Sequence, residues 1–377
     1  MKQYTIMLPT SSDNDALYNI ALTMVPEIGV KTARGLLNKF GTAADIFKAS
    51  AAELKKTDGV GEVRAKMFKE KSILLQAEKE LSFVTKNHIE LLSFGASNYP
   101  KRLQLCDDAP ILLYYKGNTD LNATKTISIV GTRKCTEYGH RLTEHLVEGL
   151  NSLNDIIVVS GLAAGIDTIA HKTAVKNAIP TVGVLGHGLD HIYPFTNKSL
   201  AKDMLSCGGL LSEYPSGTQP DRQNFPVRNR IVAGMADVTV VVESGVKGGA
   251  MITAYMALSY NRDVAAFPGR VFDGKSDGPN HLIKRNMATC ISDAADVLTL
   301  MNWAPDVKKN SVQQHLFLDL SEDEKTILQL LKEKEKVHAD ELQVQSQFKP
   351  SLLASVLLQL EMQGVIKSLP GKYYRVM

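Results

Sequence analysis

The chain has 377 residues, a formal net charge of +3, and 44% hydrophobic and 22% charged residues. Its length predicts two or three domains, and its near-neutral charge does not by itself indicate nucleic acid, so such a site must come from local clustering. No apolar run approaches the roughly 18–20 residues that span a bilayer. The polar, acidic start lacks the apolar stretch of a signal peptide, and the four cysteines are too scattered for a disulfide framework or zinc site. We therefore expect a cytoplasmic protein with no membrane segment, metal or cofactor.

Residues 1–87 lack β-branched runs and are predicted to form helices joined by glycine turns. Val25–Val30 and Asp58–Gly61 each precede a helical stretch, as in a helix-hairpin-helix, whose turn amides can hold a DNA phosphate. The second turn fits better, because Glu27 stands in the first turn where a glycine is expected. Two interpretations stay open: contact with duplex DNA, or a helical cap. The basic residues that follow the turns are Lys31, Arg34, Arg64, Lys66 and Lys69.

Between residues 88 and 303, short β-branched runs that stop at Gly, Ser or Pro alternate with helical patterns. This alternation predicts an α/β core with a doubly wound, Rossmann-like parallel sheet, and ligands of such sheets lie at the carboxyl ends of the strands. Those ends carry arginines, hydroxyls and backbone amides, which suit phosphate better than bond-breaking chemistry. The expected helices are Glu137–Leu150, Thr168–Lys176, Asn197–Ser206, Arg228–Ala236 and Ala250–Tyr260, with Ser292 capping a last short one.

Three segments at these strand ends are candidates for binding. Arg133 directly follows the first strand, and the 160–167 loop is built of small residues whose amides can approach a ligand. Phe225–Arg230 places an aromatic ring, two arginines and an amide at a helix start, a set that can stack a base and clamp a phosphate. Arginines can also pin the loops of the sheet together, and we expect Arg228 and Arg230 to divide these two tasks.

Two further patterns are expected not to be catalytic. Asp167 and His171 lie four residues apart and could hydrogen-bond, and a structural pair is favoured because no nucleophile stands beside them. Gly269–Ser276 matches the P-loop pattern, which requires a helix that begins at its Lys-Ser pair. Ser276 is followed by Asp-Gly-Pro-Asn, which we do not expect to form a helix, so ATP hydrolysis is not predicted.

The C-terminal part is predicted to be a separate module. Residues 304–318 are polar and indicate a linker, and residues 319–377 predict three helices and a hairpin, as in a winged helix. Ser321 and Glu324 form a capping box, and the third helix starts at Pro350 and ends before Gly364. The module carries eight Lys and Arg against nine Asp and Glu, and its third helix exposes Ser and Gln but no Arg, which favours protein contact over DNA reading.

Taken together, the core resembles the DNA-processing protein A family (DprA, also called Smf). The matching strings include YPKRL, PILLYYKG, SIVGTRKCTEYG, VVSGLAAGIDTIAH, VGVLGHGLDHIYPFTNKSL, LLSEYPSG, FPVRNRIVAG and FPG, in the family's order, between residues 99 and 283. The resemblance implies a dimeric, non-enzymatic protein that binds single-stranded DNA without sequence preference and loads the RecA recombinase during natural transformation. Carried over by position, the residues of the DNA pocket would be Gly131, Arg133, Ser160, Gly161, Lys198, Phe225, Arg228, Asn229 and Arg230.

Two segments depart from the family's pattern. The loop Val246–Ala250 replaces a serine-glycine-small pattern, and its Lys247 adds a further group that would favour an anion. Asn286-Met287 replaces the usual Gly-Ala. The alternative function is that of a nucleotide-processing hydrolase, similar to the phosphoribohydrolases with a Rossmann-like core. Those enzymes carry a catalytic glutamate after a glycine loop, whereas no acidic residue follows Gly248-Gly249 here.

Overall fold

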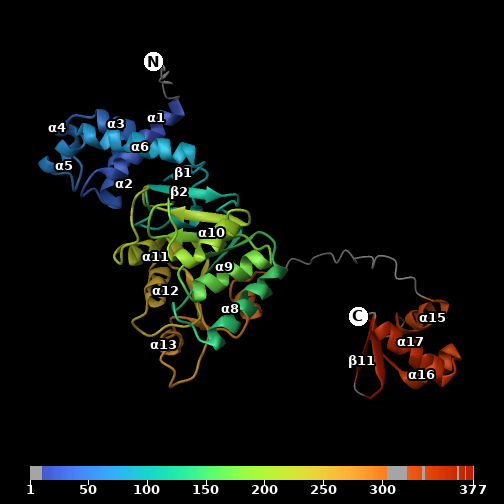
Figure 1. Ribbon diagram of the computed structural model, residues 1–377. Helices are drawn as coiled ribbons and strands as arrows, with labels where there is room; N and C mark the ends of the chain where they lie inside the picture. The colour runs from blue at the N-terminus through green and yellow to red at the C-terminus, as the bar shows by residue number, and fades with distance from the viewer. Residues whose placement is uncertain (1–10, 304–320, 333–335, 363–364, 370, 377) are drawn as a thin grey trace. The chain divides into compact units, whose positions relative to one another are not determined.

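The computed structural model describes residues 11–303, 321–332, 336–362, 365–369 and 371–376. Its contacts divide the chain into two compact units, residues 1–306 and 307–377. The predicted linker and the predicted helix end at Gly364 lie outside the described residues. The fold prediction is confirmed: an N-terminal helical part precedes a doubly wound α/β core, and a winged helix follows (Figure 1).

Among the described residues, one nine-stranded sheet forms the core, in the order β1-β2-β6-β5-β4-β3-β7-β8-β9. The ladders from β6 to β9 are parallel, and β1 and β2 add two antiparallel pairings at one side. The chain winds outward from β3 in both directions, so the order reverses between β3 and β7, where ligands of such sheets bind. The strands are β1 (Glu90–Ser93), β2 (Leu112–Gly117), β3 (Lys125–Val130), β4 (Ile156–Ser160), β5 (Thr181–Leu185), β6 (Gly208–Ser212), β7 (Val238–Val241), β8 (Asp263–Ala266) and β9 (Thr289–Cys290).

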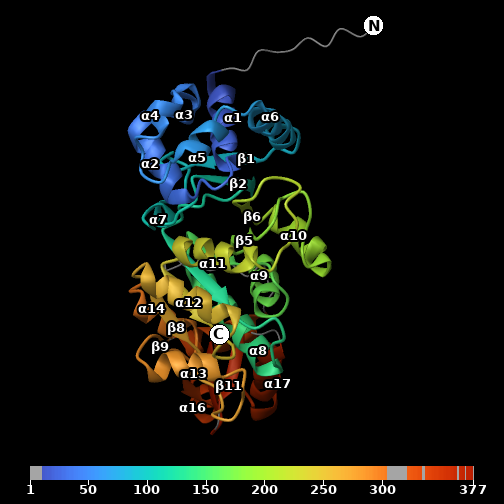
Figure 2. The same ribbon diagram turned by 90° about the vertical axis from the view of Figure 1, so that its left-hand side faces the viewer.

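Helices cover both faces of this sheet, as Figure 2 shows for α11 and α9. Alternation along the strands builds the two cores: Ile127 and Ile129 pack with Leu146 on one face, whereas Val130 packs with Ile231 and Met251 on the other. The helices of the core are α7 (Lys101–Gln104), α8 (Glu137–Gly149), α9 (Ile166–Lys176), α10 (Lys198–Met204), α11 (Asn224–Met235), α12 (Gly249–Ser259), α13 (Asp277–Lys284) and α14 (Ala294–Leu300).

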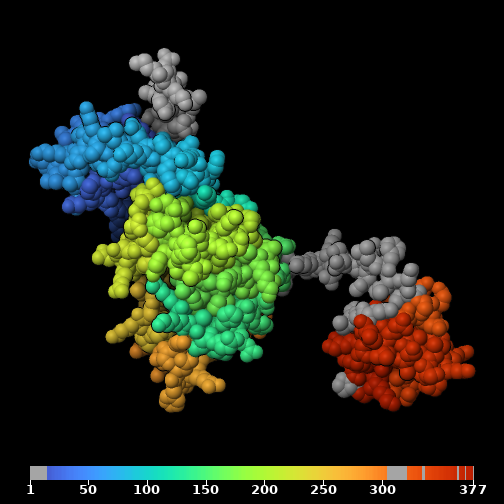
Figure 3. All heavy atoms as spheres, in the orientation of Figure 1, coloured from blue at the N-terminus to red at the C-terminus, as the bar shows by residue number. Residues whose placement is uncertain are grey.

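The N-terminal helices pack directly on the antiparallel side of the sheet (Figure 3). Ile111, Leu112 and Tyr114 of the β2 region share one hydrophobic cluster with these helices. The buried carboxylate of Glu80 accepts hydrogen bonds from the backbone and the hydroxyl of Ser216, which fixes α6 to the loop after β6. The helices are α1 (Ser11–Met24), α2 (Val30–Phe40), α3 (Ala43–Lys48), α4 (Ala51–Leu54), α5 (Glu62–Met67) and α6 (Lys71–Lys86).

The C-terminal unit has the predicted three helices and hairpin. The predicted capping box is present: the Ser321 amide donates to Glu324 Oε2 at 2.7 Å, and the Glu324 amide donates to Ser321 Oγ at 3.3 Å. One core formed by Ile327, Leu357 and Ile366, among others, joins the helices to the hairpin. The elements are α15 (Glu322–Lys332), β10 (Val337–His338), α16 (Ala339–Ser346), α17 (Pro350–Met362), β11 (Ile366–Leu369) and β12 (Tyr373–Val376).

Three expectations about helix starts were wrong. Helix α11 begins at Asn224, one turn before the predicted Arg228, and α13 begins at Asp277, directly after the P-loop-like segment. Both helices carry a proline in their first turn, where the missing N–H costs nothing because no intrahelical acceptor exists there. The cap of α14 is Asp293, whose carboxylate accepts from the Asp296 amide, whereas Ser292 donates to the Asp296 carboxylate.

Candidate nucleic-acid interface

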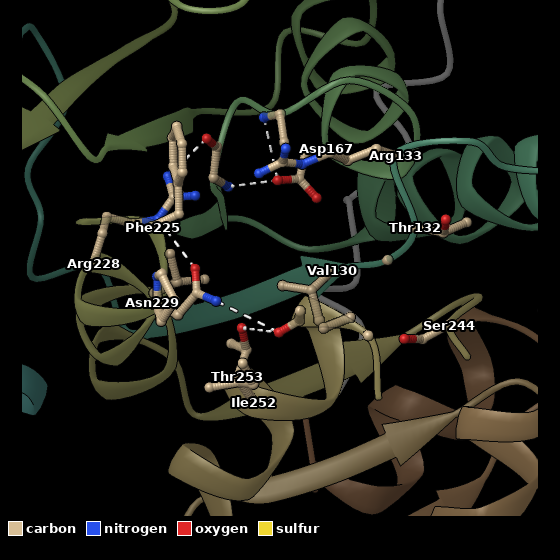
Figure 4. A pocket seen from close by; sticks show the side chains of 18 of the residues that line it. Val130, Thr132, Arg133, Asp167, Phe225, Arg228, Asn229, Ser244, Ile252 and Thr253 are labelled. Atoms are coloured by element: carbon tan, nitrogen blue, oxygen red, sulfur yellow. Dashed lines mark hydrogen bonds between the residues drawn. The ribbon is translucent and has the colours of Figure 1, made fainter. Parts of the chain in front are cut away.

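A cavity of about 560 Å³ lies over the carboxyl ends of β3, β4 and β7, at the point where the strand order reverses. The amino-terminal end of α11 and the start of α12 complete its wall. Figure 4 shows Arg133 and Asp167 on one side of the cavity, and Phe225 and Asn229 on another. The predicted residues on the wall are Gly131, Arg133, Gly161, Phe225, Arg228 and Asn229, whereas Ser160, Lys198, Arg230 and Lys247 are not part of it.

Two glycines bring backbone close to the centre of the cavity. A Cβ atom built on Gly131 would lie 2.4 Å from Ile166, and one built on Gly161 would lie 2.5 Å from the Arg228 guanidinium. A side chain at Gly131 would displace Ile166, and one at Gly161 would displace the ends of the Arg228 and Asp167 side chains, so glycine suits the packing at both positions. The close packing leaves main-chain groups of these loops as the floor of the cavity.

Arg228 is a buried part of the scaffold beneath this floor. Its side chain is 4% exposed, and Nη1 donates to the carbonyl oxygens of Gly161, at 2.7 Å, and Val184. Burial lowers the pKa of Arg228 to about 10, and the nearby Asp167 carboxylate partly offsets that effect. Because its donors are used on carbonyls at the ends of β4 and β5, Arg228 ties the two loops together.

Arg230 is buried as well and faces away from the cavity wall. It is 7% exposed and forms an ion pair with Glu213, which directly follows β6. Burial raises the pKa of Glu213, and the Arg230 charge opposes that shift. We expected one of the two arginines to clamp a phosphate, but the structure uses both inside the protein. Ser160 is equally internal, since its hydroxyl donates to the Ile129 carbonyl at 2.6 Å.

The exposed cations at the cavity are Arg133 and Arg222, and Lys247 is exposed on the adjoining loop. Within residues 11–303, none of the three forms an ion pair or a side-chain hydrogen bond, so their charges are free for a ligand. The Arg133 guanidinium lies 5.2 Å from the centre of the Phe225 ring. Arg222 was not singled out from the sequence, and its only signal was its place three residues before Phe225.

The loop after β3 is held by another residue that the sequence analysis missed. Glu243 is 1% exposed, and its carboxylate accepts hydrogen bonds from both the backbone and the hydroxyl of Thr136. The Glu243 carbonyl also accepts from the Thr132 amide at 2.7 Å. Since Arg133 lies between these two anchors, Glu243 fixes the backbone from which its free guanidinium projects.

Asp167 and His171 do not form the predicted pair. The Asp167 carboxylate accepts from the amides of Gly161, at 3.1 Å, and Ala163, at 3.3 Å, whereas His171 Nδ1 contacts the Thr181 hydroxyl at 2.7 Å. Nε2 of the fully buried His171 has no hydrogen-bond partner in the described part of the chain. Both residues therefore support the loops from behind, each through its own contacts.

Burial, aided by the Arg228 charge, lowers the pKa of His171 from 6.5 to about 3. The unfolded chain takes up this proton near pH 6.5 and the folded chain does not, so the free energy of unfolding should fall as pH drops through that window. Burial also raises the pKa of Asp167, and this shift makes the free energy of unfolding rise as pH falls. The contribution of His171 must therefore be isolated with a variant of that residue. We predict that the unfolding temperature, measured by circular dichroism, falls less between neutral and acidic pH in the His171→Gln variant than in the wild type. An identical loss in both proteins would contradict this role.

The P-loop-like segment is held by hydrogen bonds between its own residues. The Asp273 carboxylate accepts from the Lys275 amide at 3.0 Å, and the Ser276 amide donates to the Asp273 carbonyl at 2.8 Å. The prediction that no helix follows was wrong, but Asp273 already accepts from both amides through its side chain and its carbonyl, and a phosphate would need these amides. This loop is therefore not a phosphate cradle in its present arrangement.

The basic residues of the N-terminal turns are largely used within the protein. Arg34 donates to the carbonyl oxygens of Cys106 and Asp107, and Lys69 donates to the Phe47 carbonyl at 2.7 Å. Arg64 donates to the Gly59 carbonyl at 2.6 Å. Glu27 adopts φ 60°, the left-handed conformation that glycine favours, as its sequence position indicated. These contacts favour the interpretation of the helices as a cap.

In the winged helix, the third helix, α17, carries no lysine or arginine. Ser351, Ser355 and Gln359 of α17 are exposed, as predicted, and so are Leu358 at 59% and Met362 at 81%. An exposed face of small polar and apolar side chains suits a protein partner better than DNA phosphates.

These features define a Rossmann-like protein with a cation-lined cavity at its switch point, joined to a helix-hairpin-helix part and a winged helix. In comparisons with known families, residues 90–302 match the model of DNA recombination-mediator protein A, residues 318–372 the DprA winged helix domain, and residues 20–70 a SAM-like helix-hairpin-helix tandem. The first match covers more than half of the chain, so the chain belongs to the family of DNA recombination-mediator protein A.

Relatives support this membership along most of the chain. The DNA processing protein DprA of Streptococcus pneumoniae is 43% identical over 200 residues, which are 53% of this chain and 70% of that protein. Protein Smf of Escherichia coli is 32% identical over 330 residues, 80% of this chain and 84% of that protein. Among solved structures, the S. pneumoniae protein matches with a TM-score of 0.63 at 31% identity, over 78% of this chain and 98% of that chain. The Helicobacter pylori protein, whose structure describes its single-stranded DNA binding mode, matches with a TM-score of 0.51 at 30% identity, over 57% of this chain and 97% of that chain.

In the described part of the chain, no helix is both long and apolar enough to cross a membrane. Those same residues contain no cluster of His, Cys, Asp and Glu that could hold a metal ion.

Proposed function

We propose that this chain binds single-stranded DNA in the cavity over β3, β4 and β7 and acts there as a recombination mediator. The observation that carries the proposal is the pair of exposed, unpaired arginines, Arg133 and Arg222, on the wall of the cavity that also holds the half-buried Phe225 ring. The cavity wall carries three arginines against one carboxylate, so its charge suits a polyanion. An aromatic ring that shares a wall with free cations is an arrangement that binds a base and its phosphates without regard to sequence.

In this proposal some site residues contact the DNA directly, one is a candidate for contact, and others support the site from within the protein. Arg133, Arg222 and Lys247 contact phosphates, and Phe225 stacks a base. Asn229 lies on the wall and stays a candidate for direct contact. The buried residues that shape the site from behind are Ser160, Arg228 and Arg230.

The arrangement of the wall supports binding without catalysis. Asp167 is its single carboxylate among the described residues, and two loop amides hold its oxygen. The Ser244 hydroxyl on the wall donates to the Gly245 carbonyl at 2.9 Å. A hydrolase of the phosphoribohydrolase type needs a carboxylate free to stabilise a positively charged transition state, and the held Asp167 does not supply one.

The same proposal extends to partners and organisation. We propose a cytoplasmic homodimer that passes bound single strands to the RecA recombinase during natural transformation. Residues 1–87 would serve as a cap, 88–303 as the DNA-binding core and 319–377 as an auxiliary module. The exposed Leu358 and Met362 support protein contact by that module. Stimulation of RecA filament formation on single strands coated with a single-strand-binding protein tests the hand-over.

Binding itself is tested by fluorescence anisotropy of a labelled oligonucleotide, single-stranded against double-stranded, across a salt series. The proposal requires tighter single-strand binding and a steep fall of affinity with salt, because phosphate contacts release counterions. Affinities that are equal for both forms, or that do not change with salt, would refute it. Nucleoside monophosphates should then be screened for hydrolysis.

Removal of residues 319–377 should leave single-strand affinity within about threefold of the full chain, because the module brings more acidic than basic residues. The measurement is the same anisotropy titration at one moderate salt concentration. A loss of about tenfold or more would show that the winged helix contributes DNA contacts despite its charge.

A further inference from the structure

The loop between β5 and α10 exposes two aromatic rings that the cavity does not use. Phe195 is 75% exposed and Tyr193 is 47% exposed, and neither belongs to the cavity wall. Large aromatic side chains bury most of their surface in folded proteins unless they meet a ligand or a partner. The ring that was expected to stack a base, Phe225, is only half-buried but already has neighbours of its own.

One of these rings, Tyr193, is in contact with the aromatic ring of the cavity wall. The Tyr193 ring lies 5.9 Å from the Phe225 ring, which in turn lies 5.2 Å from the Arg133 guanidinium. In the same loop, Nζ of Lys198 lies 5.4 Å from the centre of the Phe195 ring. Tyr193 therefore touches the aromatic ring of the cavity wall, and Phe195, two residues further along the chain, pairs with a cation.

The structure also holds this loop rigidly against the cavity. Asn197 is 4% exposed, and its Nδ2 donates to the Leu162 carbonyl at 2.9 Å and to the Thr168 hydroxyl at 2.8 Å. Leu162 belongs to the strand-to-helix loop that includes Gly161 of the cavity wall. Since one buried amide joins both loops, the exposed rings are placed relative to the cavity before any ligand arrives, which lowers the entropy cost of binding.

We infer that a single strand leaves the cavity across Tyr193 and stacks a further base on Phe195, with a phosphate against Lys198. This inference rests on the proposed function and extends it, because it predicts a binding site longer than the cavity. Duplex DNA cannot use such a platform, since its bases are already stacked and paired. The platform therefore also provides discrimination between single and double strands.

The test uses the full chain and oligothymidylates from about 4 to about 16 nucleotides, the range of site sizes of single-strand-binding folds. Phe195→Ala should weaken binding of the long oligonucleotides by about tenfold and leave the shortest unchanged, because one stacked base is lost. Phe195→Leu should lose the same affinity, since it keeps apolar bulk but no π face, whereas Phe195→Trp should retain it.

The tryptophan variant gives a second, direct signal. The chain has one tryptophan, Trp303, which is 9% exposed, so Phe195→Trp adds an exposed fluorophore whose emission should fall when a long oligonucleotide stacks on it. Leu105→Trp is the matched control, because Leu105 is 79% exposed and outside the cavity wall, and its emission should not change.

The outcomes separate this inference from the proposed function. Wild-type protein that binds no single strand refutes both. Wild-type protein that binds, while all Phe195 variants match it at every length, refutes the platform alone. If Phe195→Ala instead changes the mass of the protein in solution without any length-dependent loss of affinity, the ring contacts another protein chain and the inference fails.

Discussion

Alanine at both Arg133 and Arg222 is expected to weaken single-strand binding about tenfold for each arginine, without lowering the unfolding temperature. Both side chains are exposed and unpaired in the described core, so their removal costs the fold little. A hydrogen bond from a charged group to a phosphate contributes roughly 1.5–3 kcal/mol, which sets this magnitude. The slope of log affinity against log salt should fall by about 0.7 for each arginine removed, as for single strands in general.

A matched control for this experiment is Arg141→Ala. Arg141 is an exposed arginine on α8 that does not belong to the cavity wall, so its removal lowers the net charge of the protein by one, as each single arginine substitution at the cavity does. Affinity and salt slope should then stay close to the wild-type values. An equal loss in the control would mean that general charge, and not the cavity, attracts the strand.

Arg228→Ala should have its main effect on stability, with a loss of about 3 kcal/mol or more in the free energy of unfolding. The substitution leaves two buried carbonyl groups without a donor and Asp167 without its guanidinium neighbour. Thermal or urea unfolding measures the change, and Arg133→Ala, at the same cavity, should unfold like the wild type. If Arg228→Ala left the free energy of unfolding unchanged but abolished DNA binding, Arg228 would be shown to contact the DNA directly.

The sequence predicted the architecture because its signals are local. β-Branched runs that end at Gly, Ser or Pro define buried parallel strands, and their alternation with helices leads to the doubly wound sheet and its switch point. The edge strands β1 and β9, and β2 beside β1, were not predicted, since β1 and β9 have only four and two residues and β2 contains no β-branched residue. The first turns of α11 and α13 were missed for a related reason, because proline and glycine resemble a loop until the helix behind them is known.

The sequence indicated where a candidate site lies, but not the part that each residue plays in it. Phe225–Arg230 lies in the first turns of α11, and the exposure of its arginines depends on neighbours far along the chain. Helix α11 packs between the sheet, α7 and α12, so Arg228 and Arg230 are only 4% and 7% exposed. Arg222 is exposed because it lies before the first residue of α11, Asn224.

The most direct test of the central claim is photocrosslinking of a single-stranded oligonucleotide that carries 4-thiothymidine, followed by mass spectrometry of the crosslinked peptides. We predict crosslinks to the segments that surround the cavity, 131–134 and 222–229, and to 193–198 with longer strands. Crosslinks confined to the N-terminal turns or to the winged helix would contradict the assignment of the cavity as the binding site.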